Sequence, residues 1–350
     1  MKKVIVLLSF VCAVLLGNEF KIAAKAYEAG DYQKAFKHTK IACDNGNYKG
    51  CGFLGALYYN GQGVRQNYKE AFKYYKLACD NGEYLGCGSL GFLYANGQGV
   101  EQNHKEAFKY FKIACDNGVY RSCYNLGVSY ERGQGVKQSY KEANKYYKIA
   151  CDNANYDGCC NLGVSYERGQ GVRQNYKEAF KYYKLACDNG EYRGCYNLGV
   201  LYASGQGVEQ NYKEAFKYHK LACDNGEYIG CNNLGNLYAN SQGVEQNYRE
   251  AFKYHKLACD NGEYLGCYNF GLLYVNGLGV EQNYKEAFKY FKIACDNGVN
   301  FGCYNLGFSY ESGRGVRQSY SIAKKYFGKA CDLGAQQGCD AFADLNQKGY

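Results

Sequence analysis

The sequence predicts an all-α protein built as an α/α solenoid of stacked helix pairs. Three observations support this fold class. The cysteines recur with a period of 36 residues from Cys43 to Cys331, each period carries two stretches of helical hydrophobic spacing, and neither a strand-like alternation nor a heptad pattern runs through the chain. Repeated helix pairs of this length cannot bury their apolar faces alone, so they stack on their neighbours.

The amino-terminal segment is typical of a secretory signal peptide. Lys2 and Lys3 precede an apolar run from Val4 to Gly17, which is shorter than a membrane span. We therefore expect residues 1–17 to be removed on export, and the mature chain to have no stable membrane anchor and to be secreted or periplasmic. The loss of two lysines would lower the net charge from +9 to +7, a mild basicity that suits an anionic partner or surface.

Residues 18–350 are predicted to form a single solenoid of about nine repeats. The first helix pair is atypical, because the short segment Tyr27–Asp31 joins its helices directly. The last segment, from Gln336 to Leu345, is more polar than the other repeats and is predicted to be a carboxy-terminal capping helix. A solenoid requires such atypical ends, since its terminal repeats lack a neighbour on one side.

Helix start and stop signals recur along the array. The helix after Asn103 is expected to end at Asp-Asn-Gly, and the preceding helix, from about Tyr84 to Ala95, to end at Asn96-Gly97. Glycine makes these turns in a chain that has 45 glycines and no proline. At the start, Asn103 and Glu106 have the spacing of a capping box, and the same spacing recurs at Asn67/Glu70, Ser139/Glu142, Asn175/Glu178, Asn211/Glu214, Asn247/Glu250 and Asn283/Glu286.

A pattern of small, aromatic and turn residues fills each period. In one period it comprises Leu198-Gly199, Tyr202, Gly205-Gln206-Gly207-Val208, Asn211-Tyr212-Lys213-Glu214-Ala215, Tyr218 and Leu221-Ala222. This pattern, which covers roughly residues 20–345, resembles the Sel1-like repeat, a relative of the tetratricopeptide repeat. With its C-x7-C hairpins and signal peptide, the chain is similar in particular to the Helicobacter cysteine-rich protein family. The resemblance implies a right-handed superhelix, a secreted or periplasmic location, penicillin binding and, in some members, weak β-lactamase activity.

Nine cysteine pairs with the C-x7-C spacing account for 18 of the 20 cysteines. Each pair would join the end of one helix to the start of the next, and closing such a nine-residue ring contributes about 2.5 kcal/mol in the chain-entropy treatment. Zinc sites usually need closer pairs in groups of four ligands, and redox catalysis needs C-x-x-C. We therefore predict no metal site and the disulfides Cys43–Cys51, Cys79–Cys87, Cys115–Cys123, Cys151–Cys159, Cys187–Cys195, Cys223–Cys231, Cys259–Cys267, Cys295–Cys303 and Cys331–Cys339.

Cys160 falls outside these pairs. It adjoins Cys159, and we expect it to be a partly buried free thiol. An intermolecular link and disulfide shuffling are the alternatives. The same repeat position is a tyrosine in four other periods: Tyr124, Tyr196, Tyr268 and Tyr304.

Repetition within one chain separates the scaffold from variable positions. Counted from the first cysteine of each period, positions 6, 8, 9, 12, 13 and 16 hardly change, and their spacing marks the packed face. Positions 7, 11, 14 and 18 lie three or four residues apart and form one stripe of the same helix. Three of the four vary, and position 11 is asparagine six times: Asn125, Asn161, Asn197, Asn233, Asn269 and Asn305.

In tetratricopeptide-like solenoids this helix lines the concave groove, so the resemblance implies that the stripe is an inner surface. Asparagine carries both donors and acceptors, so a row of asparagines could bind the backbone of an extended peptide. Residues beside them that could select partner side chains are Arg121, Arg193, Leu265 and Phe301. The alternative is that the asparagines bond to neighbouring helices and hold the superhelix. The predicted function is protein or peptide binding by a monomeric exported scaffold without a cofactor, with host interaction as one setting.

β-Lactam hydrolysis is the alternative function, with β-lactams as small-molecule ligands, and it comes only from the family resemblance. Serine β-lactamases need S-x-x-K with supporting S-D-N and K-T-G motifs. The chain has one S-x-x-K match, Ser321 to Lys324, which is the number that chance predicts, and neither supporting motif occurs. The sequence therefore gives no catalytic residues.

The remaining polar side chains favour neither metal chemistry nor nucleic-acid binding. His219 and His255 share a repeat position with Tyr183 and Phe291, so aromatic packing explains these histidines better than catalysis, and His38 and His104 lie far from them in the sequence. Basic and acidic residues alternate along the helices, as in Lys213-Glu214, so we expect no nucleic-acid partner.

Overall fold

The computed structural model describes residues 18–350; the expected signal peptide, residues 1–17, lies outside them. All the regular elements in this part of the chain are helices, which confirms the all-α fold class. Contacts between Cα atoms divide the chain into two compact units, of which the first ends at Gln174 and the second is Asn175–Tyr350. The single solenoid over residues 18–350 stays a prediction. No described helix is long and apolar enough to cross a membrane.

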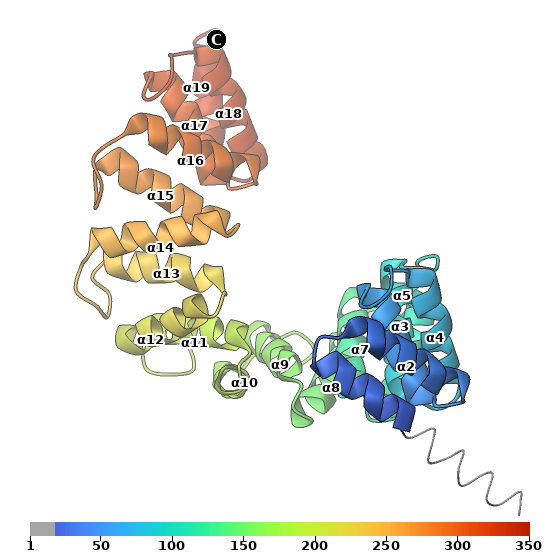
Figure 1. Cartoon of the computed structure of the whole chain (residues 1–350). Coiled ribbons are helices and arrows are strands. Elements are labelled where there is room, and N and C mark those ends of the chain that lie inside the picture. Colours follow the sequence, from blue (N-terminus) through green and yellow to red (C-terminus); the bar gives the residue numbers. More distant parts are fainter. Residues whose placement is uncertain (1–17) are drawn as a thin grey trace, which may run out of the picture. The chain divides into compact units, whose positions relative to one another are not determined.

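The first unit opens with a helix over residues 18–28, and the direct connection predicted at Tyr27–Asp31 is confirmed, because α2 starts at Tyr32. Within this unit, each helix from α2 to α8 packs against the next one along the chain (Figure 1). The further helices of the unit are α2 (Tyr32–Asp44), α3 (Tyr48–Asn60), α4 (Tyr68–Asp80), α5 (Tyr84–Asn96), α6 (His104–Asp116), α7 (Tyr120–Arg132), α8 (Tyr140–Asp152) and α9 (Tyr156–Arg168).

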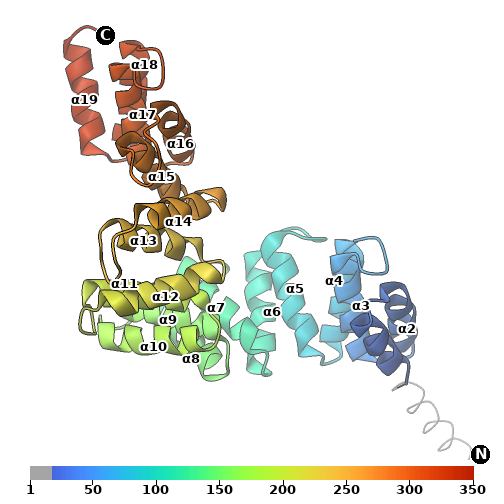
Figure 2. The same cartoon turned by 60° about the vertical axis from the view of Figure 1, so that its left-hand side comes forward.

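The second unit repeats this arrangement and ends with the capping helix that the sequence predicts (Figure 2). Consecutive helices again pack as a stack of hairpins. They are α10 (Tyr176–Asp188), α11 (Tyr192–Ser204), α12 (Tyr212–Asp224), α13 (Tyr228–Ala239), α14 (Tyr248–Asp260), α15 (Tyr264–Asn276), α16 (Tyr284–Asp296), α17 (Asn300–Ser312), α18 (Tyr320–Asp332) and α19 (Gln336–Gln347).

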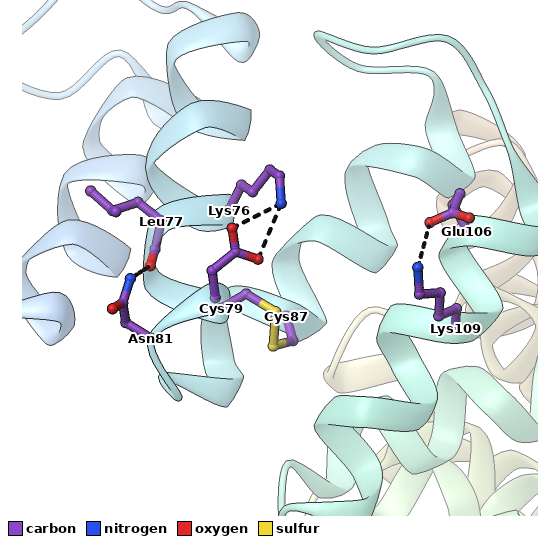
Figure 3. Close-up of polar contacts among 8 residues, drawn as sticks. Lys76, Leu77, Cys79, Asn81, Cys87, Glu106 and Lys109 are labelled. Atoms are coloured by element: carbon purple, nitrogen blue, oxygen red, sulfur yellow. Dashed lines mark hydrogen bonds and ion pairs between the residues drawn. A yellow bond between two sulfur atoms is a disulfide. The ribbon is translucent and has the colours of Figure 1, made fainter.

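The predicted N-caps form, but the capping boxes do not. The side chain of Asn103 accepts hydrogen bonds from the backbone N–H groups of Lys105 at 3.0 Å and Glu106 at 3.1 Å. The backbone N–H of Asn103 donates to the carbonyl of Tyr94 at 2.9 Å, so the glutamate has no N–H to accept from. Glu106 instead lies 3.4 Å from Lys109 on the next turn (Figure 3). The backbone of this N-cap residue therefore ties α6 to α5.

The helix ends follow the glycine pattern, with one local departure. Gly97 adopts φ +66° directly after α5 and accounts for its end. At the corresponding place after α13, Ser241 has φ +57°. Residues with a Cβ atom adopt this left-handed backbone conformation only at a cost in free energy. Helix α13 ends at Ala239 and is one residue shorter than α5.

The core of each repeat is a glycine against an aromatic ring. A Cβ atom at Gly127 would lie 2.4 Å from the ring of Tyr147, so only glycine allows this approach. Tyrosine pairs stack beside this contact, as Tyr94 and Tyr110 do with their planes 8° apart and their centroids at 5.6 Å. From α3 to α17, positions 8, 9, 12 and 13 of the predicted packed face are buried at the helix–helix interface. Position 6 was wrong, because its tyrosines are exposed at the start of their helices in four periods: Tyr48, Tyr84, Tyr120 and Tyr264.

Candidate binding surface

Nine disulfides join the helices of successive hairpins, in the pairing that the sequence predicts. Their Cα–Cα distances run from 4.4 to 4.8 Å. Cys79 at the end of α4 forms a disulfide with Cys87 in the first turn of α5 (Figure 3). At the same end of α4, the side-chain amide of Asn81 donates a hydrogen bond to the carbonyl of Leu77 at 2.8 Å. Disulfides in this number are typical of an oxidising extracellular or periplasmic environment.

Cys160 lies outside the nine disulfides, on α9. Its side chain is only 2% exposed, so it is more deeply buried than the sequence suggests. Cys160 occupies the repeat position that tyrosine fills in four other periods. Among residues 18–350, no cluster of histidine, cysteine, aspartate and glutamate could hold a metal ion.

The predicted stripe lies on the odd-numbered helices from α7 to α17. All six asparagines are half-buried, Arg121, Leu265 and Phe301 are exposed, and Arg193 is half-buried. In the first unit the stripe holds Arg121, Asn125 and Asn161; in the second it holds Arg193, Asn197, Asn233, Leu265, Asn269, Phe301 and Asn305.

Three of the asparagines use their side chains within the fold. Asn269 donates to the side-chain oxygen of Asn232 at 2.9 Å and to that of Asn236 at 3.4 Å. Asn305 donates to the carbonyl of Phe301 at 3.1 Å and is hydrogen-bonded to Tyr268, and Asn161 is hydrogen-bonded to Tyr147. These contacts support the alternative in which the asparagines tie repeats together. A carboxamide has four bonding positions, two N–H donors and two lone pairs. These contacts leave at least two of them on each of the three asparagines, so peptide binding by the same side chains stays open.

The second unit contains a buried polar cluster that the sequence analysis missed. Asn232 is 1% exposed, and its side-chain oxygen lies 3.0 Å from Nδ1 of His255. Burial lowers the pKa of His255 to about 4, and that of His219 likewise to about 4. Both rings are therefore neutral, and the ring of His219 packs 5.8 Å from that of Tyr196. These contacts agree with the packing role expected for the two histidines.

Two adjoining pockets open on the stripe of the first unit. The first, which we call the Gly52 pocket, has a volume of about 460 Å³ and is lined by residues that include Gly52, Tyr75 and Leu85. The second, the Gly88 pocket, has a volume of about 600 Å³, and its lining includes Leu85, Gly88, Phe92, Arg121, Asn125 and Asp157. The structure thus brings predicted residues Arg121 and Asn125 together in one site.

Each pocket occupies the place of a missing tyrosine. Gly52 and Gly88 stand at position 10, where Tyr268 stands in the second unit. The ring of Tyr268 lies 6.1 Å from that of Phe291 and 5.9 Å from that of Phe301. Where glycine replaces this tyrosine, the corresponding space is open. The sequence shows both glycines, but position 10 was not part of the predicted binding stripe.

The wall between the two pockets carries polar groups. Tyr75, Leu85 and Ser89 line both pockets. The hydroxyl of Tyr75 is hydrogen-bonded to Ser89, and burial raises the pKa of Tyr75 to about 12, so this phenol is neutral at physiological pH. The Ser89 hydroxyl also donates to the carbonyl of Leu85 at 3.1 Å.

Each pocket also has one cation and one anion in its lining. These are Lys49 and Glu83 at the Gly52 pocket, and Arg121 and Asp157 at the Gly88 pocket. An apolar floor with a few polar groups suits the binding of a side chain and its adjoining backbone.

The S-x-x-K match does not form a catalytic pair. Ser321 is exposed in the first turn of α18. The ammonium group of Lys324 donates to the side-chain oxygen of Asn346 at 2.8 Å and to the carbonyl of Tyr350. This lysine is thus held by the carboxy-terminal segment.

Comparison with known proteins identifies the family. The family described as "Sel1 repeat" matches nine stretches: residues 20–47, 49–83, 86–119, 121–155, 157–191, 193–227, 229–263, 265–299 and 301–334. The chain belongs to the Sel1 repeat family. The nine matches agree with the predicted count of repeats, and they make the chain a Sel1 repeat scaffold.

Curated relatives resemble the chain over short stretches. "Putative beta-lactamase HcpE" of Helicobacter pylori is 50% identical over 44 residues, which are 13% of this chain and 12% of that protein. "Putative beta-lactamase HcpD" of the same species is 39% identical over 59 residues, 17% of this chain and 19% of that protein. These matches support the resemblance to the Helicobacter cysteine-rich proteins and cover too little of them to carry over an activity.

Solved structures share the fold over much longer stretches. A protective antigen of uropathogenic Escherichia coli strains with an SLR fold has a TM-score of 0.73 and 25% identity, covering 89% of this chain and 67% of that one. A Sel1 repeat protein from Oxalobacter formigenes has a TM-score of 0.65 and 25% identity, covering 70% of this chain and 96% of that one. Both support the α/α solenoid.

Proposed function

We propose that the chain is an exported scaffold that binds an extended segment of another protein along its odd-numbered helices. Repeat solenoids typically use such extended surfaces for protein interaction. The observation that carries the proposal is the pair of adjoining pockets, where Leu85 leaves 72% and Phe92 43% of its surface exposed. Apolar side chains gathered in a concave site with polar neighbours are typical of a binding surface.

The half-buried stripe would then bind the backbone of the partner. Asn125 lines the Gly88 pocket together with Arg121, so amide groups lie beside the apolar floor. The even-numbered helices offer less to an anionic polymer, because many of their lysines are paired with acidic residues of the same helix, as Lys76 is with Asp80 at 2.8 Å (Figure 3). This pairing supports a protein partner rather than a nucleic acid.

We place this function outside the cytoplasm. The nine disulfides support an oxidising compartment, and residues 1–17 would direct export to the periplasm or the medium. The scaffold would act as a monomer and without a cofactor, and a host protein is one candidate partner.

β-Lactam binding or hydrolysis is the second candidate, and it rests on the names of relatives. The matches to those relatives span 12% of HcpE and 19% of HcpD. In this chain, the lysine of the S-x-x-K match is held by Asn346, so the geometry provides no activated serine. We therefore propose protein binding as the function.

A display experiment tests the proposal. A random peptide library is selected on the immobilised mature chain, and selected peptides are measured against wild type, Leu85→Asp and Leu77→Asp. Leu77 is a matched control, because it is 40% exposed but lies on α4, outside the two pockets. The proposal expects binding that falls at least tenfold in Leu85→Asp and is unchanged in Leu77→Asp. Equal losses in both variants, or no selected peptide, would refute it.

A further inference from the structure

We propose that the Gly52 and Gly88 pockets bind two aromatic side chains of one extended partner segment, each ring filling the place that a repeat tyrosine fills elsewhere. This inference rests on the proposed function and names the chemistry of the partner. The array itself provides the template for the bound ring, because four other repeats keep tyrosine at this position: Tyr124, Tyr196, Tyr268 and Tyr304.

The surroundings of the template ring recur at both glycines. In the second unit, the ring of Tyr268 packs against Phe291, at the buried aromatic position, and against Phe301, at position 7 of the next repeat. At Gly52 these two positions are Tyr75 and Leu85, and both line the Gly52 pocket. A ring inserted there would meet an aromatic side chain on one side and an aliphatic side chain on the other.

The neighbour of the missing ring is left uncovered. Leu85 and Leu265 occupy the same repeat position, but Leu85 is 72% exposed and Leu265 is 42% exposed. The two leucines differ in the residue at position 10 of the preceding repeat. For Leu85 this residue is Gly52, which has no side chain, and for Leu265 it is Asn232, which has an amide side chain. An incoming ring would cover the apolar surface of Leu85, and burial of such surface is the main driving force for binding.

The Gly88 pocket adds electrostatic complementarity to an aromatic face. Arg121 stands at the position of Phe301, whose ring lies 5.9 Å from that of Tyr268. A ring placed beside Gly88 would therefore have the guanidinium group against its face. This cation–π arrangement is more favourable for an aromatic ring than for an aliphatic group of similar size.

The two pockets lie close enough for one segment to fill both. They share Tyr75, Leu85 and Ser89 and belong to successive repeats, so their centres are separated by a helix spacing on the order of 10 Å. An extended chain advances about 3.3 Å per residue and presents every second side chain to one face. We therefore expect partner segments with aromatic residues two to four positions apart.

Filling the pockets from within the chain provides a clean test. A Cβ atom at Gly52 would meet only Ala78, at 3.6 Å, so the first atom of the Gly52→Tyr side chain fits without a clash and its ring is directed to the place that Tyr268 fills in its own repeat. A Cβ atom at Gly88 would lie 2.7 Å from the hydroxyl of Ser122, and Ser122 replaces the glycine of other repeats, so Gly88→Tyr is paired with Ser122→Gly. The filled variant carries all three changes and restores the residues of the other repeats.

The first measurement uses p-cresol, the side chain of tyrosine, as the probe. In methyl-labelled mature chain, we expect saturable NMR shifts at Leu85 and Val119, which line the pockets. The filled variant should bind p-cresol at least tenfold more weakly, and cyclohexanol, of similar size but not aromatic, should bind wild type less well. Equal binding of p-cresol by the filled variant, or equal binding of both probes, would overturn the inference.

The second measurement separates this inference from the proposed function. Peptides selected on wild type should be enriched in aromatic pairs, and the filled variant should not select them. Peptides without aromatic residues that still lose affinity in Leu85→Asp would overturn the inference and leave the proposed function intact. If wild type selects no peptides, both fail. Concentration-dependent self-association that p-cresol reverses would make a second copy of the chain the occupant and would likewise overturn the inference.

Discussion

The amide of Asn269 and the Nδ1 atom of His255 converge on one oxygen, the side-chain carbonyl of Asn232, at 2.9 and 3.0 Å. This buried contact joins three successive helices of the second unit, α13, α14 and α15. It shows that at least one asparagine of the stripe holds repeats together.

Asn269→Ala should lower stability by about 1 kcal/mol, because it removes one intramolecular hydrogen bond from a half-buried site. The control is Asn276→Ala on the same helix, since the Asn276 amide is exposed and bonds only to the Leu272 carbonyl. Urea unfolding of the two variants, followed by circular dichroism, measures the difference. Equal stability of the variants would mean that the Asn269 contact does not stabilise the fold.

The buried histidines should make the protein less stable in acid. Burial lowers the pKa of His219 from 6.5 to about 4, so between these values the unfolded chain binds a proton that the folded chain does not. The free energy of unfolding is therefore unaffected by protonation of His219 above pH 6.5. It falls as the pH drops below this value, by on the order of 3 kcal/mol at pH 4.

His219→Phe should remove this part of the pH dependence, because phenylalanine fills the same repeat position at Phe111 and Phe291. It should also stabilise the protein at pH 7, since the Nδ1 atom of His219 is buried without a hydrogen-bond partner. The comparison is made by urea unfolding at pH 7 and pH 4.5. A pH dependence identical to that of wild type would show that His219 does not titrate as proposed.

Two glycines of α3 should respond oppositely to alanine. Gly52→Ala adds a Cβ atom in ordinary contact with Ala78, at 3.6 Å, and should stabilise the helix by about 0.5–1 kcal/mol. Gly55→Ala adds one 2.7 Å from the ring of Tyr75 and should destabilise the protein by about 1–3 kcal/mol. Melting temperatures of the two variants test both signs, and a stabilised Gly55→Ala would contradict the described packing.

Removing one disulfide should loosen one hairpin. Cys79→Ala with Cys87→Ala removes the bond between α4 and α5 and should cost up to about 2.5 kcal/mol. Since repeat arrays need not unfold in one step, the sensitive readout is hydrogen exchange of amides in α4 and α5. Faster exchange confined to these helices and their neighbours is expected, and unchanged protection would show that the disulfide adds nothing to the hairpin.

Nitrocefin hydrolysis by the purified mature chain should be indistinguishable before and after Ser321→Ala. The reason is that Ser321 is exposed and Lys324 is held by Asn346. Turnover that disappears in Ser321→Ala would contradict the proposed function and restore the hydrolase alternative.

Most of the fold could be predicted from the sequence, because residues that recur at the same position in every repeat indicate which side chains pack between helices. The C-x7-C spacing predicted all nine disulfides, and Asn-Gly predicted the helix ends. The capping box predicted for Glu106 was wrong. The backbone N–H of Asn103, to which Glu106 would bond, donates instead to the carbonyl of Tyr94 in the preceding helix. This contact between helices does not show in the local sequence spacing.

The candidate site was predictable only in part. Arg121 and Asn125 were found because they vary or recur along one stripe. The pockets were missed because they arise from absent side chains at Gly52 and Gly88, and a missing ring matters only through the residues packed around it. The buried cluster at Asn232 was missed for a related reason, since it joins three helices whose side chains meet only in the folded chain.

The most direct test of the central proposal is site-specific photo-crosslinking in the native compartment. A benzoylphenylalanine is placed at Phe92, which lines the Gly88 pocket, and, in a second strain, at Leu77 on α4. The account predicts a discrete crosslinked partner at position 92 that is absent at position 77 and is lost when Leu85→Asp is added. Crosslinking of the same partner at both positions, or its persistence in Leu85→Asp, would contradict the account.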